Sequence, residues 1–394
     1  MIEKINYNSL YCMRIIKRAF GTFLEAFLVL YFFQLSDSNI LPIGIYKLCA
    51  VITTWLIIFI TRNICKTKHR IKLLRFGIIM YFIYFLSLIL LKEKVVNYIA
   101  LVGMIYGLAE GFYYSVYNMI ESDGISNEKR QKFLGGTHAI NDILSIVLPT
   151  FFGYIVLKTG FVNSLILIIC IVTIQIVMSY LLKDINIPKH KKVDFKEFRN
   201  IVKNNNVLKL LFKMRLFEGI LYAEGAFNMI VSLFIIRVFS DSFSLGIFTS
   251  IFSIVSATLG ILFIKVIKVK HYKDLIIFSS LFTSISLIFM IVNCNALSII
   301  IFNFFHKISR GAMTLINVKN IHDTANDLKI KNEYKVEYYV SLESFLAIGR
   351  VIGCGLFILM AFTNSNIILY IFALLLIICS FYVVKVQDAI NKKA

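Results

Sequence analysis

Paired cysteine ligands and catalytic signatures are missing from this 394-residue sequence. The seven cysteines include no C-x-x-C pair, so the spacing of a zinc site or of a redox dithiol is absent. No P-loop, H-E-x-x-H or G-x-S-x-G sequence occurs. We therefore expect no enzyme, no cofactor and no metal. Without a nucleotide site, any energy-requiring work must draw on an ion gradient or on a solute's own gradient.

A cleavable signal peptide is also missing. Residues 1–14 hold Asn6, Tyr7, Asn8 and Arg14, and no small-residue cleavage site precedes a mature domain. The weak alternating ten-residue signals of a membrane β-barrel are absent as well. We therefore interpret the first hydrophobic run as a retained membrane span.

Long hydrophobic runs are what the sequence has in abundance, and 59% of the residues are hydrophobic. An apolar helix of about 20 residues spans a bilayer, and inside a bilayer a helix satisfies its own backbone polar groups. The sequence predicts an all-α integral membrane protein with twelve transmembrane helices. Their expected ranges are 15–36, 40–61, 73–91, 95–120, 133–157, 161–182, 207–236, 243–264, 274–292, 296–318, 336–360 and 364–384.

Positive charge is strongly uneven along the chain, whose formal net charge is +20. If the N-terminus is cytoplasmic, 34 of the 42 Lys and Arg residues fall on inner segments. The outer loops then hold only Lys92, Lys94 and Lys158. This positive-inside bias predicts that both termini are cytoplasmic, in a bacterial cell membrane. It also favours basic loops beside anionic lipid over a nucleic-acid partner.

The longest polar interval divides the twelve predicted spans into six and six. We expect an N-terminal six-helix bundle at 1–183, a cytoplasmic linker at 184–206 and a C-terminal six-helix bundle at 207–394. The halves also share weak similarities, with the "SDS" of 36–38 matching that of 240–242.

Two further matches between the halves involve charged residues. At an offset of 200, Glu110 aligns with Arg310, and at an offset of 208, Asp142 aligns with Arg350. The common offset of about 200, in the same order, favours two pseudo-symmetric bundles built from a duplicated six-helix unit. Opposite charges at equivalent positions also predict pairs that neutralise each other and that a proton or a charged solute can separate.

Twelve spans as six plus six, both ends inside and a basic central loop resemble the major facilitator superfamily. In that fold, two halves rock around a site near the middle of the bilayer. The family's signature loop, Gly-x-x-x-Asp-Arg-x-Gly-Arg-Lys, corresponds to "TRNICKTKHR" at 61–70, where Thr61 replaces the glycine and Cys65 the aspartate. The antiporter motif of the fifth span is reduced to Pro149 and Gly153.

Ionisable residues inside the predicted spans are the main functional signal. Such groups are costly in a bilayer and mark ion or solute pathways, although a buried pair can also only fix helix register. The resemblance implies that spans one, four, seven and ten line a central cavity. The candidate charged or titratable residues are Glu25, Glu110, Asp142, His138, Glu224, Arg310 and Arg350.

Aromatic and amide side chains accompany these charges. Helical spacing places Glu110, Tyr113, Tyr114 and Tyr117 on one face, which is suited to an apolar or cationic solute but equally to ordinary packing. Asn118 and Asn228 are candidate polar contacts. Gly107 and Gly111, four residues apart, predict a close approach between helices.

These features predict a monomeric secondary transporter that moves a small or amphipathic solute by alternating access. We favour proton-coupled efflux, with the proton carried by Glu110 or Asp142. The alternatives are a nutrient importer, a flippase for a lipid-linked solute, or a membrane sensor or immunity protein that transports nothing. A membrane enzyme acting through "IHDTAND" at 321–327 is less favoured, because a solvated loop explains those residues.

Overall fold

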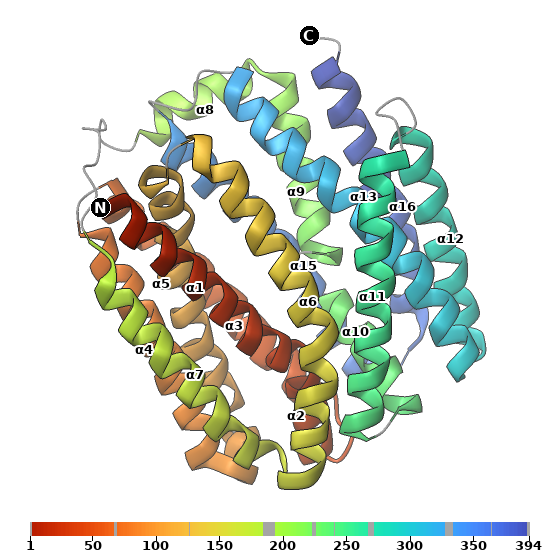
Figure 1. Ribbon diagram of the computed structural model, residues 1–394. Helices are drawn as coiled ribbons and strands as arrows, with labels where there is room; N and C mark the ends of the chain where they lie inside the picture. Colours follow the sequence, from red (N-terminus) through yellow and green to blue (C-terminus); the bar gives the residue numbers. More distant parts are fainter. Residues whose placement is uncertain are drawn as a thin grey trace. The chain divides into compact units, whose positions relative to one another are not determined.

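A computed structural model gives the arrangement of the chain (Figure 1). It describes residues 2–66, 69–125, 127–183, 194–222, 226–239, 241–266, 272–327, 334–363 and 365–391. In these ranges the regular structure is helical throughout, with no strand. The all-α prediction is confirmed.

The chain forms two compact units. One comprises Met1–His190 with Phe239–Ile251, and the other comprises Lys191–Val238 with Phe252–Ala394. The division into bundles at 184–206 stays a prediction. The predicted linker contains a short helix, α8 (Phe195–Lys203), whose N-terminus is capped by the Asp194 side chain.

The first unit contains helices over the six ranges predicted for the N-terminal half. Within it, α5 packs against α3 and α4, while α1 packs against α6 and α7 (Figure 1). Its helices are α1 (Ile2–Phe23), η1 (Leu24–Leu28), α2 (Val29–Leu35), α3 (Leu41–Thr61), η2 (Ile64–Lys66), α4 (Arg70–Leu91), η3 (Lys92–Tyr98), α5 (Ile99–Gly124), α6 (Asn127–Thr159) and α7 (Phe161–Leu181).

In the second unit, α9 packs against α15 and α16, and α12 packs against α13 and α16. Within the seventh predicted span, α9 ends at Leu221 and α10 begins at Ala226, and residues 223–225 between them lie outside the described part of the chain. The helices that follow α8 are α9 (Asn206–Leu221), α10 (Ala226–Val238), α11 (Ser242–Val266), α12 (Tyr272–Val292), α13 (Ala296–Asp327), α15 (Lys335–Thr363) and α16 (Ile367–Asn391).

Seven helical stretches of the described residues are long and apolar enough to cross a membrane. They establish a multi-pass membrane protein, while the number twelve stays a prediction. The seven stretches are Leu41–Thr61, Arg70–Tyr117, Ala139–Thr159, Phe161–Leu181, Lys273–Val292, Val336–Thr363 and Ile367–Ile390.

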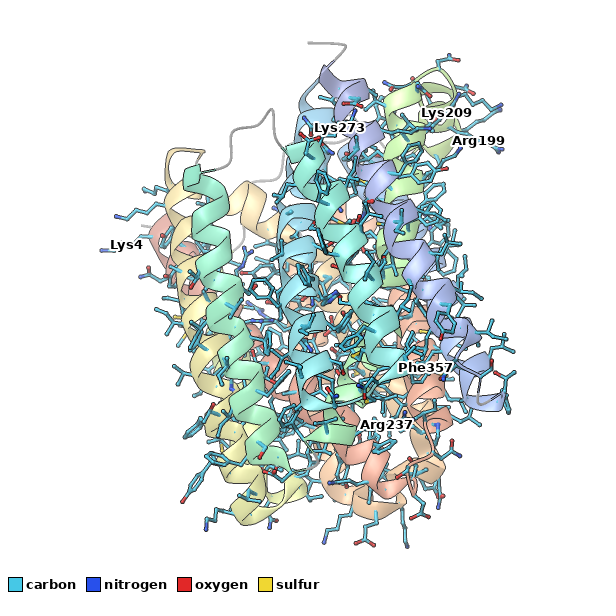
Figure 2. All side chains as sticks on the ribbon, turned by 90° about the vertical axis from the view of Figure 1, so that its right-hand side faces the viewer. Lys4, Arg199, Lys209, Arg237, Lys273 and Phe357 are labelled. Atoms are coloured by element: carbon cyan, nitrogen blue, oxygen red, sulfur yellow. The ribbon has the colours of Figure 1, made fainter. Side chains whose placement is uncertain are left out.

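Basic side chains gather at one end of the second unit. Figure 2 shows Arg199, Lys209 and Lys273 toward the same end, whereas Arg237 lies well away from them. The charge distribution predicts that Arg199, Lys209 and Lys273 are cytoplasmic. Their side of the membrane stays a prediction.

Glycines permit the closest helix contacts in the first unit. A Cβ atom added to Gly103 would lie 2.5 Å from the Tyr46 carbonyl oxygen, and one added to Gly107 would lie 2.5 Å from that of Ala50. A Cβ atom on Gly111 would lie 2.6 Å from Cβ of Ile57. The prediction of a close approach along α5 is confirmed, and its partner is α3.

Candidate functional site

Glu110 lies in the buried middle of α5, and its side chain is 6% exposed. Its Oε1 atom accepts a hydrogen bond from the Lys17 ammonium at 2.6 Å and another from the Tyr81 hydroxyl at 2.7 Å. Lys17 comes from α1 and Tyr81 from α4, so three helices meet at this carboxylate. Glu110 is therefore a buried carboxylate with a charged partner and a hydroxyl partner in the same unit.

The charged partner of Glu110 differs from the one expected from the repeat. The sequence pairs Glu110 with Arg310, whereas the described ion pair joins Glu110 to Lys17. Arg310 lies half-buried on α13 in the second unit, one turn after the buried His306. A Glu110–Arg310 pairing stays a prediction.

Aromatic rings surround the Lys17 ammonium. Its Nζ atom lies 4.5 Å from the ring centre of Tyr81, 4.8 Å from that of Phe20 and 5.6 Å from that of Tyr114. Ring faces stabilise a cation through their quadrupoles, most strongly where water is excluded. We call Glu110, Phe20, Tyr81 and Tyr114, together with Lys17, the ammonium site.

The three predicted tyrosines have different roles. Tyr117 is buried, and its hydroxyl donates to the Leu10 carbonyl at 2.9 Å, which ties α5 to α1. Tyr113 is buried against it, with stacked ring centres 5.0 Å apart. Tyr114 alone is exposed, at 39%. Packing therefore accounts for Tyr117 and most of Tyr113, while Tyr114 borders the ammonium site.

A second charged group lies further along α1. The Arg18 guanidinium pairs with Glu25 at 3.3 Å and donates to the Ser145 hydroxyl at 2.8 Å. The Glu25 side chain is 60% exposed and belongs to η1, a π-helical turn of the kind often found at functional positions. Asp142 is also exposed, one turn before Ser145, and no hydrogen bond or ion pair of its carboxylate occurs among the described residues.

A third cluster joins α9 to α15. The buried Arg215 bonds Glu218 at 2.7 Å and Glu343 at 3.2 Å. The neighbouring Glu337 accepts from the Asp194 backbone N–H at 2.9 Å, which ties the start of α8 to α15. These contacts join helix ends within the unit, as expected of charges that fix helix packing.

Polar contacts connect the end of α9 to α10 and α13. Asn228 of α10 donates its side-chain amide to the Tyr222 carbonyl at 3.3 Å. The buried His306 stacks on Tyr222 with ring centres 5.9 Å apart. Within the described chain, its Nδ1 atom has no hydrogen-bond partner.

Not every predicted residue can be placed. Glu224 and the side chains of Asn118 and His138 lie outside the described residues. Arg350 is half-buried on α15 in the second unit. No cluster of three or more His, Cys, Asp or Glu able to hold a metal ion occurs in the described part of the chain.

Five residues of these clusters were not predicted from the sequence: Lys17, Tyr81, Arg18, Arg215 and His306. Lys17 and Arg18 lie near the start of the first predicted span, 15–36, whereas α1 begins at Ile2 and places them well inside a helix. A signal was present, because the two basic residues directly precede a long apolar run containing Glu25.

The departures from the family's loop and span motifs have structural explanations. The Cys65 thiol, in place of the usual aspartate, donates to the Ser115 carbonyl at 3.3 Å and so joins η2 to α5. A Cβ atom on Gly153 would lie 2.5 Å from the Ser242 carbonyl oxygen, so α6 and the start of α11 pack closely within the first unit. The glycine remnant of the antiporter motif therefore has a packing role.

Helices of membrane-spanning length with charges buried between them are typical of membrane transporters. The sequence matches the profile of the Major Facilitator Superfamily over residues 19–327. This match covers most of the chain, and the protein belongs to that superfamily. It is a transporter and not an enzyme.

Solved structures with the same fold support this assignment. A bacterial homologue of the iron transporter ferroportin, in an inward-facing state, aligns with a TM-score of 0.71 and 14% identity over 98% of this chain and 100% of that one. The peptide transporter POT, solved with sulfate, aligns with a TM-score of 0.69 and 11% identity, covering 98% and 95% of the two chains.

A relative by sequence is YqgE of Bacillus subtilis (strain 168), itself uncharacterized. The two chains are 23% identical over 327 residues, which is 82% of this chain and 75% of YqgE.

Proposed function

We propose that this protein exports a small or amphipathic solute across the bacterial cytoplasmic membrane in exchange for protons. Twelve spans in two six-helix bundles, with both termini cytoplasmic, would alternate access to a central site. One observation carries the proposal: the Glu110 carboxylate is buried, and the Lys17 ammonium is its one ion-pair partner among the described residues. A group held in this way can exchange its partner for a proton or a solute, which is what coupling requires.

The direction of solute transport follows from its exchange against protons. The bacterial proton gradient is directed inward, so a carrier that exchanges a proton for a solute at one carboxylate drives the solute outward. Asp142 is the second candidate proton carrier, because it is exposed and lies one turn from the Ser145–Arg18 contact. The close packing of Gly153 explains why a glycine of the antiporter motif is present, so this glycine is not evidence for efflux. The proposal of efflux is based on the buried carboxylate.

Replacing Glu110 with glutamine is expected to abolish gradient-driven transport. Glutamine keeps the acceptor for Tyr81 but carries no exchangeable charge. The protein is reconstituted into vesicles with a solute found by a thermal-shift screen. Accumulation driven by an imposed pH difference should therefore vanish.

Asp142→Asn serves as the comparison for this experiment, and Glu197→Gln on the exposed face of α8 is the matched control. The control should transport at the wild-type rate per folded molecule. If the Glu110 and Asp142 variants both keep full pH-dependent transport, the proposed coupling site is wrong.

The native Cys294 provides a test of orientation. This exposed thiol lies between α12 and α13, in a loop that the charge distribution places outside. A membrane-impermeant maleimide added to intact cells is expected to label it, and Cys294→Ser should remove that labelling. Asn204→Cys, made in the Cys294→Ser background, should react only after the cells are opened. The reverse pattern would invert the proposed topology.

A further inference from the structure

Lys17 occupies a place built for an alkylammonium ion. A lysine side chain is a butylammonium group on a tether, and here it is enclosed by three rings and neutralised by one carboxylate. Aromatic rings combined with a carboxylate are the chemistry by which proteins recognise organic ammonium ligands. The site would hold a free cation of this kind by the same contacts.

The site has an open side. Phe20 and Tyr81 are fully buried, whereas Tyr114, the third ring, is 39% exposed. Both hydrogen bonds to Glu110 end on Oε1, which leaves Oε2 without a bond from any described residue. A ligand that enters past Tyr114 would therefore meet an oxygen that the protein does not already use.

The Lys17 ammonium makes fewer hydrogen bonds than expected of an ion pair that only stabilises the fold. An ammonium group has three donors, and within the described ranges Lys17 makes one hydrogen bond, to Glu110. Buried charges that only hold a fold together are stable when their remaining donors are satisfied as well. Arg215 is held by two carboxylates and Lys17 by one, so a ligand has to replace fewer charged contacts at Lys17.

We propose that Lys17 is an internal surrogate for the transported solute, which is an organic monocation bearing an ammonium group. The inference rests on the proposed function and names its substrate class. The solute takes the place of the Lys17 ammonium against Glu110 and the three rings. Lys17 then loses its carboxylate partner, and it refills the site after the solute leaves.

The proton balance follows from this exchange. A Lys17 ammonium that leaves Glu110 has no other carboxylate partner among the described residues and stays between helices, where a neutral amine is less costly than an ammonium. It releases one proton, and the nitrogen keeps its electron pair. One cation enters as one proton leaves, so the charge of the site is unchanged. When the solute departs, the amine takes up a proton and returns to Glu110.

Binding of n-butylammonium to the purified protein in detergent tests this proposal. Lys17→Met empties the site without adding a charge and is expected to bind n-butylammonium at least tenfold more tightly than the wild type, because no tethered ammonium competes. Adding Glu110→Gln to this variant should remove the binding. The neutral isostere n-butanol should bind to neither protein. Lys209→Met, an exposed lysine on α9, is the matched control and should behave as wild type.

A second measurement uses the wild-type protein, so it does not depend on how well a variant folds. Acetic anhydride modifies neutral, accessible amines, and the Lys17 side chain is 12% exposed. Adding n-butylammonium should raise acetylation of Lys17, read by mass spectrometry, at least fivefold, while n-butanol and sodium butyrate should not.

Equal affinity of the wild type and Lys17→Met, similar binding of n-butanol, or unchanged Lys17 acetylation would overturn the surrogate role. Such a result leaves proton coupling at Glu110 to be judged by the vesicle experiment. The opposite outcome is also distinguishable. If the Glu110→Gln variant still shows proton-coupled transport, Glu110 is not the coupling site, whatever the result of the n-butylammonium binding experiment.

Discussion

Lys17→Met and Glu110→Gln are each expected to destabilise the folded protein by about 3–5 kcal/mol, the loss typical of a buried ion pair that keeps only one partner. In either variant, a charge stays between α1, α4 and α5 without its counter-charge. The double variant should recover much of the loss, because neither charge remains. Unfolding in detergent, followed as a melting temperature and as an unfolding free energy, measures the coupling.

The exposed pair Lys273–Asp388 is a matched control for this cycle. Its atoms lie 3.5 Å apart, and its side chains are 56% and 49% exposed. Solvent and salt screen such a pair, so the cycle Lys273→Met with Asp388→Asn should show a coupling of at most about 1 kcal/mol. Additive losses at Lys17 and Glu110, like those of the surface pair, would show that the buried ion pair contributes no stability.

Gly349→Ala is expected to disrupt the second unit, with a loss of about 1–3 kcal/mol or more. A Cβ atom on Gly349 would overlap the Leu216 carbonyl oxygen, and one on Gly219 would overlap that of Leu346. The two glycines bring α9 and α15 into backbone contact, as small residues do between membrane helices. The helices must separate to admit even one methyl group. The yield of monodisperse protein and its melting temperature both report the effect.

Gly355→Ala provides the control on the same helix. A Cβ atom at that position meets nothing within 4 Å, so the substitution tests helix propensity without a clash. Alanine favours a helix over glycine by about 1 kcal/mol, and this variant should match or exceed the wild type in stability. Equal losses in Gly349→Ala and Gly355→Ala would show that backbone contact does not stabilise the α9–α15 crossing.

Local pattern accounts for much of the fold. The apolar runs predict helices because a bilayer leaves the backbone no other way to satisfy its polar groups, and the four-residue spacing of Gly107 and Gly111 predicts a close helix contact. The end of α9 at Leu221 was not predicted. This residue lies inside one apolar stretch, and composition does not reveal where a helix ends within such a stretch.

The candidate site was predicted only in part. Glu110 is identifiable because a carboxylate in an apolar run is unusual. Its partner Lys17 is 93 residues away, and their contact depends on how α1 and α5 pack. An internal repeat aligns equivalent positions of two halves but does not identify neighbours within one half. It therefore points to Arg310, in the other unit, and not to Lys17; the Glu110–Arg310 pairing stays a prediction.

The number of protons released per cation bound tests the central claim most directly. The purified wild-type protein is titrated with n-butylammonium in weakly buffered detergent solution, with a pH indicator and a calorimeter reading the two quantities together. If Lys17 gives up its proton when the cation binds, the wild type should release about one proton per cation bound. Lys17→Met should bind the cation and release none, while Glu110→Gln should do neither. Cation binding by the wild type without proton release, or equal release by Lys17→Met, would show that Lys17 is not exchanged for the solute.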